Sequence, residues 1–240
     1  MILAAGRGTR MQSMTAGRPK PLIEVGGKAL VEHILDRLCQ AGARSFLVVT
    51  GYRATMIEDR LAKYPAEIAF RRQAMPDGTA RAARLAREFA GNDPFLLTFG
   101  DILADPDDYR AMAAVLESDP TAAAVLAVQY AADPWRGAAV YENGGRVTAI
   151  VEKPPPGSST TNWNSAGIYV FRPEVFDELE RVPRSPRGEY ELTSAIAQLI
   201  AGVARVLMHP VRGPWLDVGR PEDVAAAERM VRGQGETEAG

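Results

Sequence analysis

The sequence predicts an α/β protein with a Rossmann-like, mostly parallel sheet and helices on both faces. Two observations lead to this fold class. Through residue 120, short apolar runs alternate with stretches of helical periodicity, as in βαβ units. Beyond it, four strand-like runs follow one another with only turns or loops between them, which indicates a mixed-strand insertion. The 240 residues, 46% of them hydrophobic, can bury a substantial core.

The first half of the chain opens with an apolar strand over residues 1–4 and a short strand that ends at Gly26-Gly27. Leucine and isoleucine recur at helical spacing over 29–41, where Gly42 stops the pattern. The β-branched run 45–49 is typical of a buried parallel strand. The further elements expected are helix 53–63, strand 67–70, helix 80–89, strand 94–99 and a helix to residue 117 that Asp105 caps and Pro106 begins.

The second half contains the mixed strands. Asn143-Gly144-Gly145 is a strong hairpin signal between two of them. The expected strands are 123–128, 137–141, 147–151, 167–171 and 204–208, and the expected helices are 192–200 and 221–232. We expect one catalytic domain over residues 1–232, whose mixed strands build one wall of a site, and a disordered tail over 233–240.

Composition narrows the function classes. A net charge of −2 and a pI near 5.8 argue against a nucleic-acid binder. Cys39 is the only cysteine, and no signal peptide is evident, so a reducing cytoplasm is the expected location. No apolar run approaches the roughly 18 residues of a membrane span, so no membrane partner is expected. His33 and His209 show no zinc-ligand spacing with Cys39. The oligomeric state stays open, and a homo-oligomer is compatible with the sequence.

The segment after the first strand favours an anionic ligand. Gly6 and Gly8 have no Cβ and can adopt positive φ, so backbone N–H groups there can approach an anion closely. Arg10 and Lys20 bring positive charge to the same place, which suits a polyphosphate. The segment is neither a P-loop nor a full dinucleotide fingerprint. A surface turn with two solvated cations is the alternative reading.

Charged residues directly follow three other apolar runs. In open α/β sheets, ligands bind outside the carboxyl ends of the strands, and Asp101, the Glu152-Lys153 pair and Asp217 occupy such places. Two carboxylates without histidine or cysteine suit Mg²⁺. Taken singly, each aspartate is equally compatible with a turn or cap, and the pair with a solvated strand end. Their joint occurrence with the glycine-rich segment favours phosphoryl or nucleotidyl transfer.

The stretch 73–80 offers a second kind of recognition. The amide of Gln73 is both donor and acceptor, and Gly78 lets a backbone group meet a flat ring edge. Together they suit the polar edge of a nucleobase. A turn that opens the helix at Ala80 explains the glycine as well, although it leaves Gln73 unexplained.

Seven segments together resemble the sugar-1-phosphate nucleotidylyltransferases, the class of the glucose-1-phosphate thymidylyl- and uridylyltransferases. They are residues 3–11, 19–22, 73–80, 99–101, 151–154, 164–169 and 215–219, in the order of that family. The resemblance spans residues 3 to about 223 and implies the nucleotide-diphospho-sugar transferase fold. It further implies that a sugar 1-phosphate attacks the α-phosphorus of a nucleoside triphosphate in line, with Mg²⁺ and without a covalent enzyme intermediate.

The resemblance also assigns roles by position. Arg10 would hold the β- and γ-phosphates, and Lys20 the triphosphate or developing pyrophosphate, which makes them the catalytic pair. Asp101 and Asp217 would bind Mg²⁺. The nucleotide would contact Ala5, Gly6, Gly8, Gln73, Gly78 and Thr79. The sugar phosphate would contact Gly137, Glu152, Lys153 and Asn164.

Several alternatives stay open. UTP or dTTP is favoured, but guanylyl- and cytidylyltransferases use related signatures, and the sugar is not determined. We expect the chain to lack the left-handed β-helix of bifunctional relatives. A non-catalytic nucleotide or NDP-sugar sensor on the same fold is a second hypothesis. A dinucleotide-dependent oxidoreductase is a third, which the missing third glycine disfavours.

Overall fold

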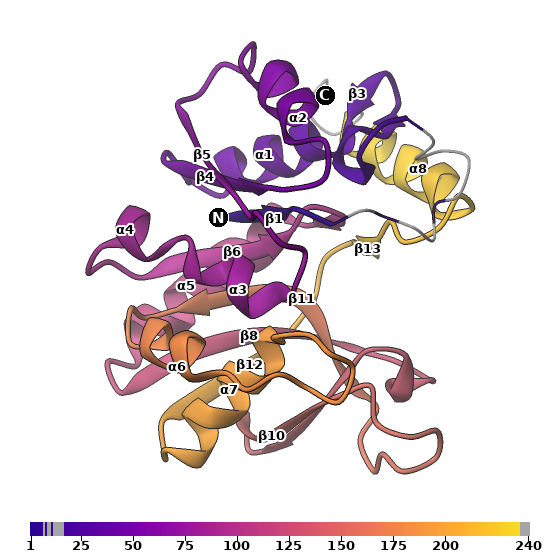
Figure 1. Ribbon diagram of the computed structural model, residues 1–240. Helices are drawn as coiled ribbons and strands as arrows, with labels where there is room; N and C mark the ends of the chain where they lie inside the picture. Colours follow the sequence, from indigo (N-terminus) through magenta and orange to yellow (C-terminus); the bar gives the residue numbers. More distant parts are fainter. Residues whose placement is uncertain (7, 9–10, 12–16, 236–240) are drawn as a thin grey trace. The chain divides into compact units, whose positions relative to one another are not determined.

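The computed structural model describes residues 1–6, 8, 11 and 17–235. The chain consists of two compact units (Figure 1). The strand-rich unit comprises Met1, Asp77–Thr98 and Arg110–Arg212. The parallel-sheet unit comprises Ile2–Pro76, Phe99–Tyr109 and Gly213–Gly240. One catalytic domain over residues 1–232 therefore stays a prediction.

The parallel-sheet unit is built on three parallel strands, β1 (Ile2–Ala4), β4 (Phe46–Thr50) and β5 (Ile68–Arg72). Ile2 lies opposite Val48, and Phe46 lies opposite Ile68. All residues of β1 and β4 are buried, as their continuous apolar sequence predicts. The helices that connect these strands are α1 (Leu30–Gln40) and α2 (Ala54–Leu61). These elements agree with the predicted βαβ units.

Two short strand pairs complete this unit. β2 (Glu24–Val25) pairs with β3 (Lys28–Ala29), and β7 (Ile102–Ala104) pairs antiparallel with β13 (Trp215–Asp217). The 3-10 helix η2 (Lys20–Leu22) contacts α1. The last helix, α8 (Asp223–Gly235), begins and ends later than predicted, so residues 233–235 are helical instead of disordered. Residues 236–240 of the predicted tail lie outside the described residues.

The strand-rich unit contains the predicted mixed strands, in the order β6 (Phe95–Phe99), β11 (Trp163–Phe171), β8 (Ala122–Tyr130), β12 (Arg205–Pro210), β10 (Arg146–Glu152) and β9 (Ala138–Asn143). Neighbours run antiparallel, except that β12 is parallel to β8. The predicted hairpin joins β9 to β10, and positive φ at both Gly144 and Gly145 is what a type I′ turn requires. The mixed sheet predicted for the second half is thus confirmed.

Helices of this unit differ in part from expectation. The helix predicted over residues 80–89 is two short helices, α3 (Thr79–Arg84) and α4 (Arg87–Ala90). The break follows from tighter bonds at the end of α3, where Leu85 and Ala86 donate to carbonyls three residues earlier. The helix α6 (Val175–Arg181) was not predicted, whereas α7 (Leu192–Ala201) was. In Figure 1 these two helices lie side by side, and α7 contacts β10 and β12.

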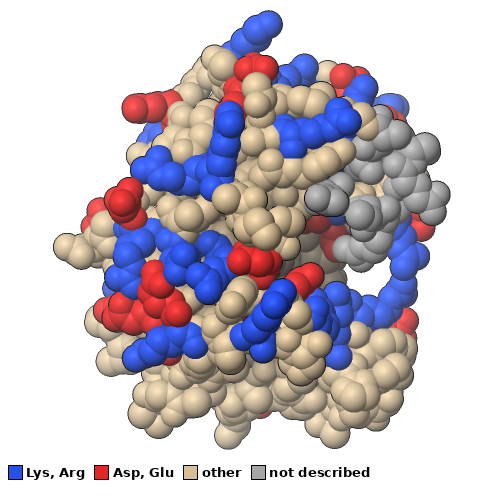
Figure 2. All heavy atoms as spheres, in the orientation of Figure 1, with Lys and Arg blue, Asp and Glu red and all other residues tan. Residues whose placement is uncertain are grey.

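The helix α5 (Pro106–Ser118) begins as predicted. The side chain of Asp105 accepts a hydrogen bond of 2.9 Å from the N–H of Asp107, which caps the helix. Its residues are divided between the two units. Within the described part of the chain, no helix has the length and apolar character needed to cross a bilayer. On the face drawn in Figure 2, basic and acidic side chains are interspersed and form no single basic field.

Candidate active site

Lys20 and the two aspartates at predicted strand ends lie together in the parallel-sheet unit. The Nζ of Lys20 is 2.5 Å from Oδ2 of Asp101 and 3.8 Å from Oδ1 of Asp217. The pairing of β7 with β13 brings the aspartates together, because Asp217 lies opposite Ile102. A 2.9 Å hydrogen bond from the N–H of Val218 to the carbonyl of Asp101 extends this pairing. Three segments far apart in sequence thus converge on one cluster of charges.

Lys20 is the buried member of this cluster of charges. Lys20 is only 7% exposed, and a buried ammonium group is stable only when it is paired. The two carboxylates supply that pairing, and their side chains are themselves 26% and 44% exposed. The cluster therefore joins a buried cation to two carboxylates that solvent or a ligand can reach.

The donor set of Asp101 and Asp217 fits a hard divalent cation. Mg²⁺ binds one or two protein carboxylates and completes its octahedron with water and phosphate oxygens. Across the described residues, no group of three or more histidine, cysteine, aspartate or glutamate side chains could form a fuller protein cage. The two aspartates suit a metal that shares its coordination with a phosphorylated substrate.

The glycine-rich segment packs directly on Lys20. Gly8 has φ +62°, and a Cβ at this position would lie 2.8 Å from Cβ of Lys20. A glycine is therefore required here both by conformation and by space. Ala5 is buried and Gly6 is exposed, with open space around it. Arg10, the other predicted catalytic cation, lies outside the described residues.

The predicted base-reading stretch is divided between the two units. Gln73 follows β5 in the parallel-sheet unit, where its N–H donates to the carbonyl of Thr50 at 2.8 Å. In the strand-rich unit, Gly78 has φ +131°, and a Cβ there would lie 2.2 Å from the carbonyl oxygen of Tyr190. The hydroxyl of Thr79 accepts a 2.9 Å hydrogen bond from the N–H of Leu192. Gly78 and Thr79 thus have a packing role, and nucleotide contacts by these residues stay a prediction.

The four predicted sugar-phosphate residues lie at neighbouring strand ends of the strand-rich unit. A Cβ at Gly137 would lie 2.3 Å from Oδ1 of Asn164, so the two residues touch. Asn164 is buried and donates its amide to the carbonyl of Pro134 at 2.7 Å. The N–H of Lys153 donates to the carbonyl of Gly137 at 2.9 Å, and Glu152 ends β10 one residue earlier. The structure therefore places these four residues together.

Lys153 has an unusual backbone. Its φ is +43°, a left-handed conformation that residues with a Cβ rarely adopt. The residue is exposed, so packing of its side chain does not explain the conformation. Strained backbone of this kind concentrates at functional sites, where surrounding structure holds it in place. The conformation makes Lys153 a candidate functional residue after β10.

Glu152 has two partners that the sequence did not reveal. Nη1 of Arg187 is 3.2 Å from its Oε1, and the hydroxyl of Thr193 donates to its Oε2 at 3.3 Å. Arg187 also pairs with Glu191 at 3.2 Å. The only sequence signal was a polar run over residues 183–191 ahead of α7. These contacts hold the Glu152 carboxylate in place. They also bring the guanidinium of Arg187 to the end of β10, next to Lys153 in the sequence.

Tyr169 lies in the same unit as Glu152 and stays neutral. Burial of the phenol raises its pKa above the usual value, and the negative charge of Glu152 raises it further. Its hydroxyl forms a 2.7 Å hydrogen bond with that of Ser165. The neutral phenol therefore adds no charge of its own near Glu152.

Comparison with known proteins gives a consistent result. The nucleotidyl transferase family matches residues 1–233. The chain is 31% identical over 246 residues to the UTP--glucose-1-phosphate uridylyltransferase AglF of Haloferax volcanii, covering 97% of this chain and 96% of that protein. It is 34% identical over 238 residues to the low-salt glycan biosynthesis nucleotidyltransferase Agl11 of the same organism, and 33% identical over 232 residues to the bifunctional protein GlmU of Methanocaldococcus jannaschii. Both alignments cover 96% of this chain, but it spans only 65% of Agl11 and 53% of GlmU.

Solved structures agree in fold. A putative glucose-1-phosphate thymidylyltransferase from Bacillus anthracis superposes with a TM-score of 0.85 at 25% identity, covering 96% of this chain and 94% of that one. A UDP-glucose pyrophosphorylase in complex with UDP-glucose also gives 0.85, at 20% identity and 97% coverage of both chains. The predicted fold class is confirmed by these matches.

Proposed function

Because the chain belongs to the nucleotidyl transferase family, we propose that it transfers a nucleoside monophosphate from a nucleoside triphosphate to a sugar 1-phosphate. The products are an NDP-sugar and pyrophosphate. The observation that carries this proposal is the buried Lys20 ammonium group between the carboxylates of Asp101 and Asp217. UTP or dTTP is the favoured donor, since AglF is named for UTP and the Bacillus anthracis protein for thymidylyl transfer.

The reaction is a direct displacement. A phosphate oxygen of the sugar 1-phosphate forms a bond to the α-phosphorus, and the bond from that phosphorus to the α,β-bridging oxygen breaks. Pyrophosphate leaves with the electron pair of the broken bond. No protein nucleophile is needed, so the protein contributes position and charge.

The parallel-sheet unit holds the leaving group in this proposal. Lys20 and Arg10 place positive charge beside the phosphates, where negative charge grows as pyrophosphate departs. Asp101 and Asp217 would hold Mg²⁺, which neutralises phosphate charge when bound. Gly8 keeps the glycine-rich backbone against Lys20. Gln73 remains our candidate for reading the base.

The strand-rich unit holds the sugar phosphate. Glu152, oriented by Arg187 and Thr193, accepts hydrogen bonds from sugar hydroxyls. Asn164 and the backbone at Gly137 contribute further polar groups, and Lys153 binds the phosphate. Because the partners of Glu152 already hold its side chain in place, less conformational entropy is lost when the sugar phosphate binds in a reactive geometry.

The test is a matrix assay with pyrophosphate release as the readout. UTP, dTTP, CTP, GTP and ATP are each offered with glucose, mannose, N-acetylglucosamine, N-acetylmuramic acid and heptose 1-phosphates. Release with one pair supports the function, whereas binding without release from any pair would indicate a sensor.

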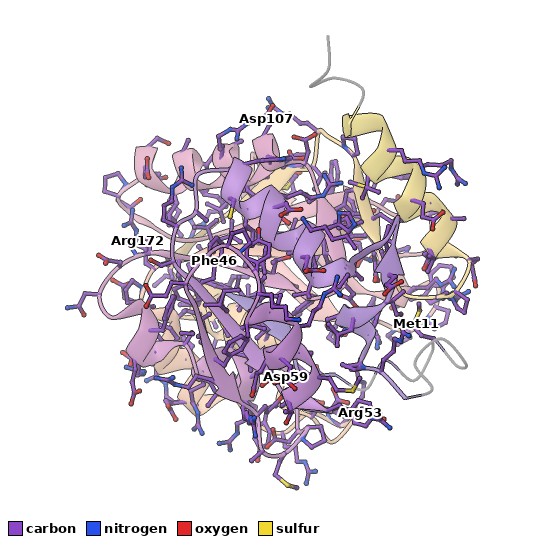
Figure 3. All side chains as sticks on the ribbon, turned by 90° about the horizontal axis from the view of Figure 1, so that it is seen from above. Met11, Phe46, Arg53, Asp59, Asp107 and Arg172 are labelled. Carbon is purple, nitrogen blue, oxygen red and sulfur yellow. The ribbon has the colours of Figure 1, made fainter. Side chains whose placement is uncertain are left out.

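Asp101→Asn tests the carboxylate assignment in the same assay. The variant removes one charge beside Lys20, and we expect kcat to fall at least about 100-fold while the protein stays folded. Asp59→Asn is the control, because Asp59 is exposed on α2 (Figure 3). Unchanged turnover in Asp101→Asn would refute the role of that residue.

A further inference from the structure

The turn between β4 and α2, residues 51–53, contacts the glycine-rich segment at both of its described ends. At one end, the N–H of Tyr52 donates to the carbonyl of Ala5 at 3.1 Å. At the other, the guanidinium of Arg53 donates from Nη1 to the carbonyl of Gly17. Three consecutive residues therefore hold two points that are twelve positions apart in the chain.

The contact at Ala5 is so close that it requires a glycine at position 51 of the turn. Gly51 does not have positive φ, so backbone conformation does not require a glycine there. A Cβ on Gly51, however, would lie 2.7 Å from the carbonyl oxygen and 2.9 Å from the Cβ of Ala5. The glycine is needed for the close approach of the turn to Ala5.

The contact at Gly17 depends on a strained arginine. Arg53 has φ +50° and ψ +43°, a left-handed conformation, at the position that precedes α2. Its Nε donates to the hydroxyl of Tyr52 at 3.0 Å, and its guanidinium lies 5.5 Å from the centre of that ring. The side chain is exposed, so burial does not account for the conformation. The contacts with Tyr52 instead direct the guanidinium to Gly17.

We propose that Arg53, with Gly51 and Tyr52, is a positioning clamp for Ala5 and Gly17, the two described ends of the segment in which Gly8 packs on Lys20, and that it sets the affinity for the nucleoside triphosphate. The inference rests on the proposed function for its substrate. Arg53 is a positioning residue here, since its Nη1 donates to a backbone carbonyl of the protein and it acts on the triphosphate only through the segment that it holds. The clamp acts by holding both ends of the segment that follows β1.

The test compares Arg53→Gly with Arg60→Met. Glycine removes the guanidinium and relieves the left-handed strain, so the Tm should not fall. Arg60 lies on α2, which follows Arg53, and pairs with Glu32, so Arg60→Met removes the same charge away from the clamp. For Arg53→Gly we expect the KM for the triphosphate to rise about tenfold and the KM for the sugar phosphate to stay within about twofold. Arg60→Met should leave both unchanged.

A second variant and a second readout make the outcome decisive. Gly51→Ala pushes on Ala5 and should also raise the triphosphate KM selectively. Hydrogen exchange in a peptide covering residues 5–20 should quicken in Arg53→Gly and stay as in the wild type in Arg60→Met. A triphosphate KM within twofold of wild type in Arg53→Gly, or unchanged exchange, would overturn the clamp. If the wild type releases no pyrophosphate, the proposed function fails, and the exchange experiment still decides the clamp.

Discussion

Lys20 illustrates how one side chain can serve both folding and the proposed chemistry. Its ammonium group is buried, and the carboxylates of Asp101 and Asp217 offset the cost of that burial. The same three charges form the cluster proposed to receive the triphosphate and its metal. A residue in this position cannot be changed without altering both the charge of the site and the balance of the buried cluster.

Gly8 allows a test that separates backbone strain from contact with Lys20. Gly8→Ala forces a Cβ into φ +62° and within 2.8 Å of Cβ of Lys20. Gly144→Ala is the matched control, because Gly144 has φ +58° with nothing near the added Cβ. Both variants should lose about 1 kcal/mol of unfolding free energy from strain in chemical denaturation. Only Gly8→Ala should also lower kcat/KM, by at least about tenfold. Equal activity in the two variants would contradict the contact with Lys20.

The charged residues of the site could be predicted from the sequence, whereas their long-range packing contacts could not. The aspartates could be selected because each follows an apolar run, and Lys20 because it brings a cation to the glycine-rich segment after the first strand. The packing of Gly78 could not be predicted, because the backbone that leaves no room for a side chain there belongs to Tyr190, more than 100 positions away. Arg187 was missed for the same reason, since Glu152 is distant in sequence. Long-range contacts leave no local periodicity.

At the scale of elements, long periodic segments were predicted well and short ones were not. The apolar strands and α1 follow from periodicity over many residues. The three-residue strands β7 and β13 carry too few residues for a pattern, yet their pairing is what joins Asp101 to Asp217. The site therefore depends on the elements that sequence patterns specify least.

The residue type at the C-terminal end of α7 is not optimal for stability. Gly202 has an ordinary φ, whereas the next residue, Val203, has φ +60° and is 82% exposed. A β-branched residue is poorly suited to this left-handed position, where helices usually place glycine. Val203→Gly should relieve roughly 1–2 kcal/mol of strain and lose about half of that to the greater freedom of the unfolded chain.

The net gain in Val203→Gly should be about 0.5–1 kcal/mol in urea denaturation, with pyrophosphate release unchanged. Val203→Ala is the control, because it removes the branch but keeps the Cβ, and it should gain less. Little packing is lost in either variant, since the side chain is exposed. If Val203→Gly were less stable than the wild type, the strain at Val203 would be smaller than the conformational entropy that glycine adds to the unfolded chain.

At the scale of the whole molecule, the proposed function assigns the charged residues that hold each substrate to a different compact unit. The triphosphate residues Lys20, Asp101 and Asp217 belong to the parallel-sheet unit, and Glu152 with Arg187 belongs to the strand-rich unit. This division predicts that substitutions of these charged residues act selectively on the KM of one substrate. It gives a test that does not depend on which sugar or base is used.

Glu152→Gln is the sharpest form of that test. The amide keeps the shape of the carboxylate but loses the charge that Arg187 pairs with and the second acceptor that sugar hydroxyls would use. We expect the KM for the sugar phosphate to rise at least about tenfold and the KM for the triphosphate to stay within about twofold. Glu142→Gln is the control, since Glu142 lies on β9 of the same unit and accepts a hydrogen bond from the N–H of Gly145 in the hairpin turn. If Glu152→Gln instead raised the triphosphate KM alone, the substrates would be assigned to the wrong units.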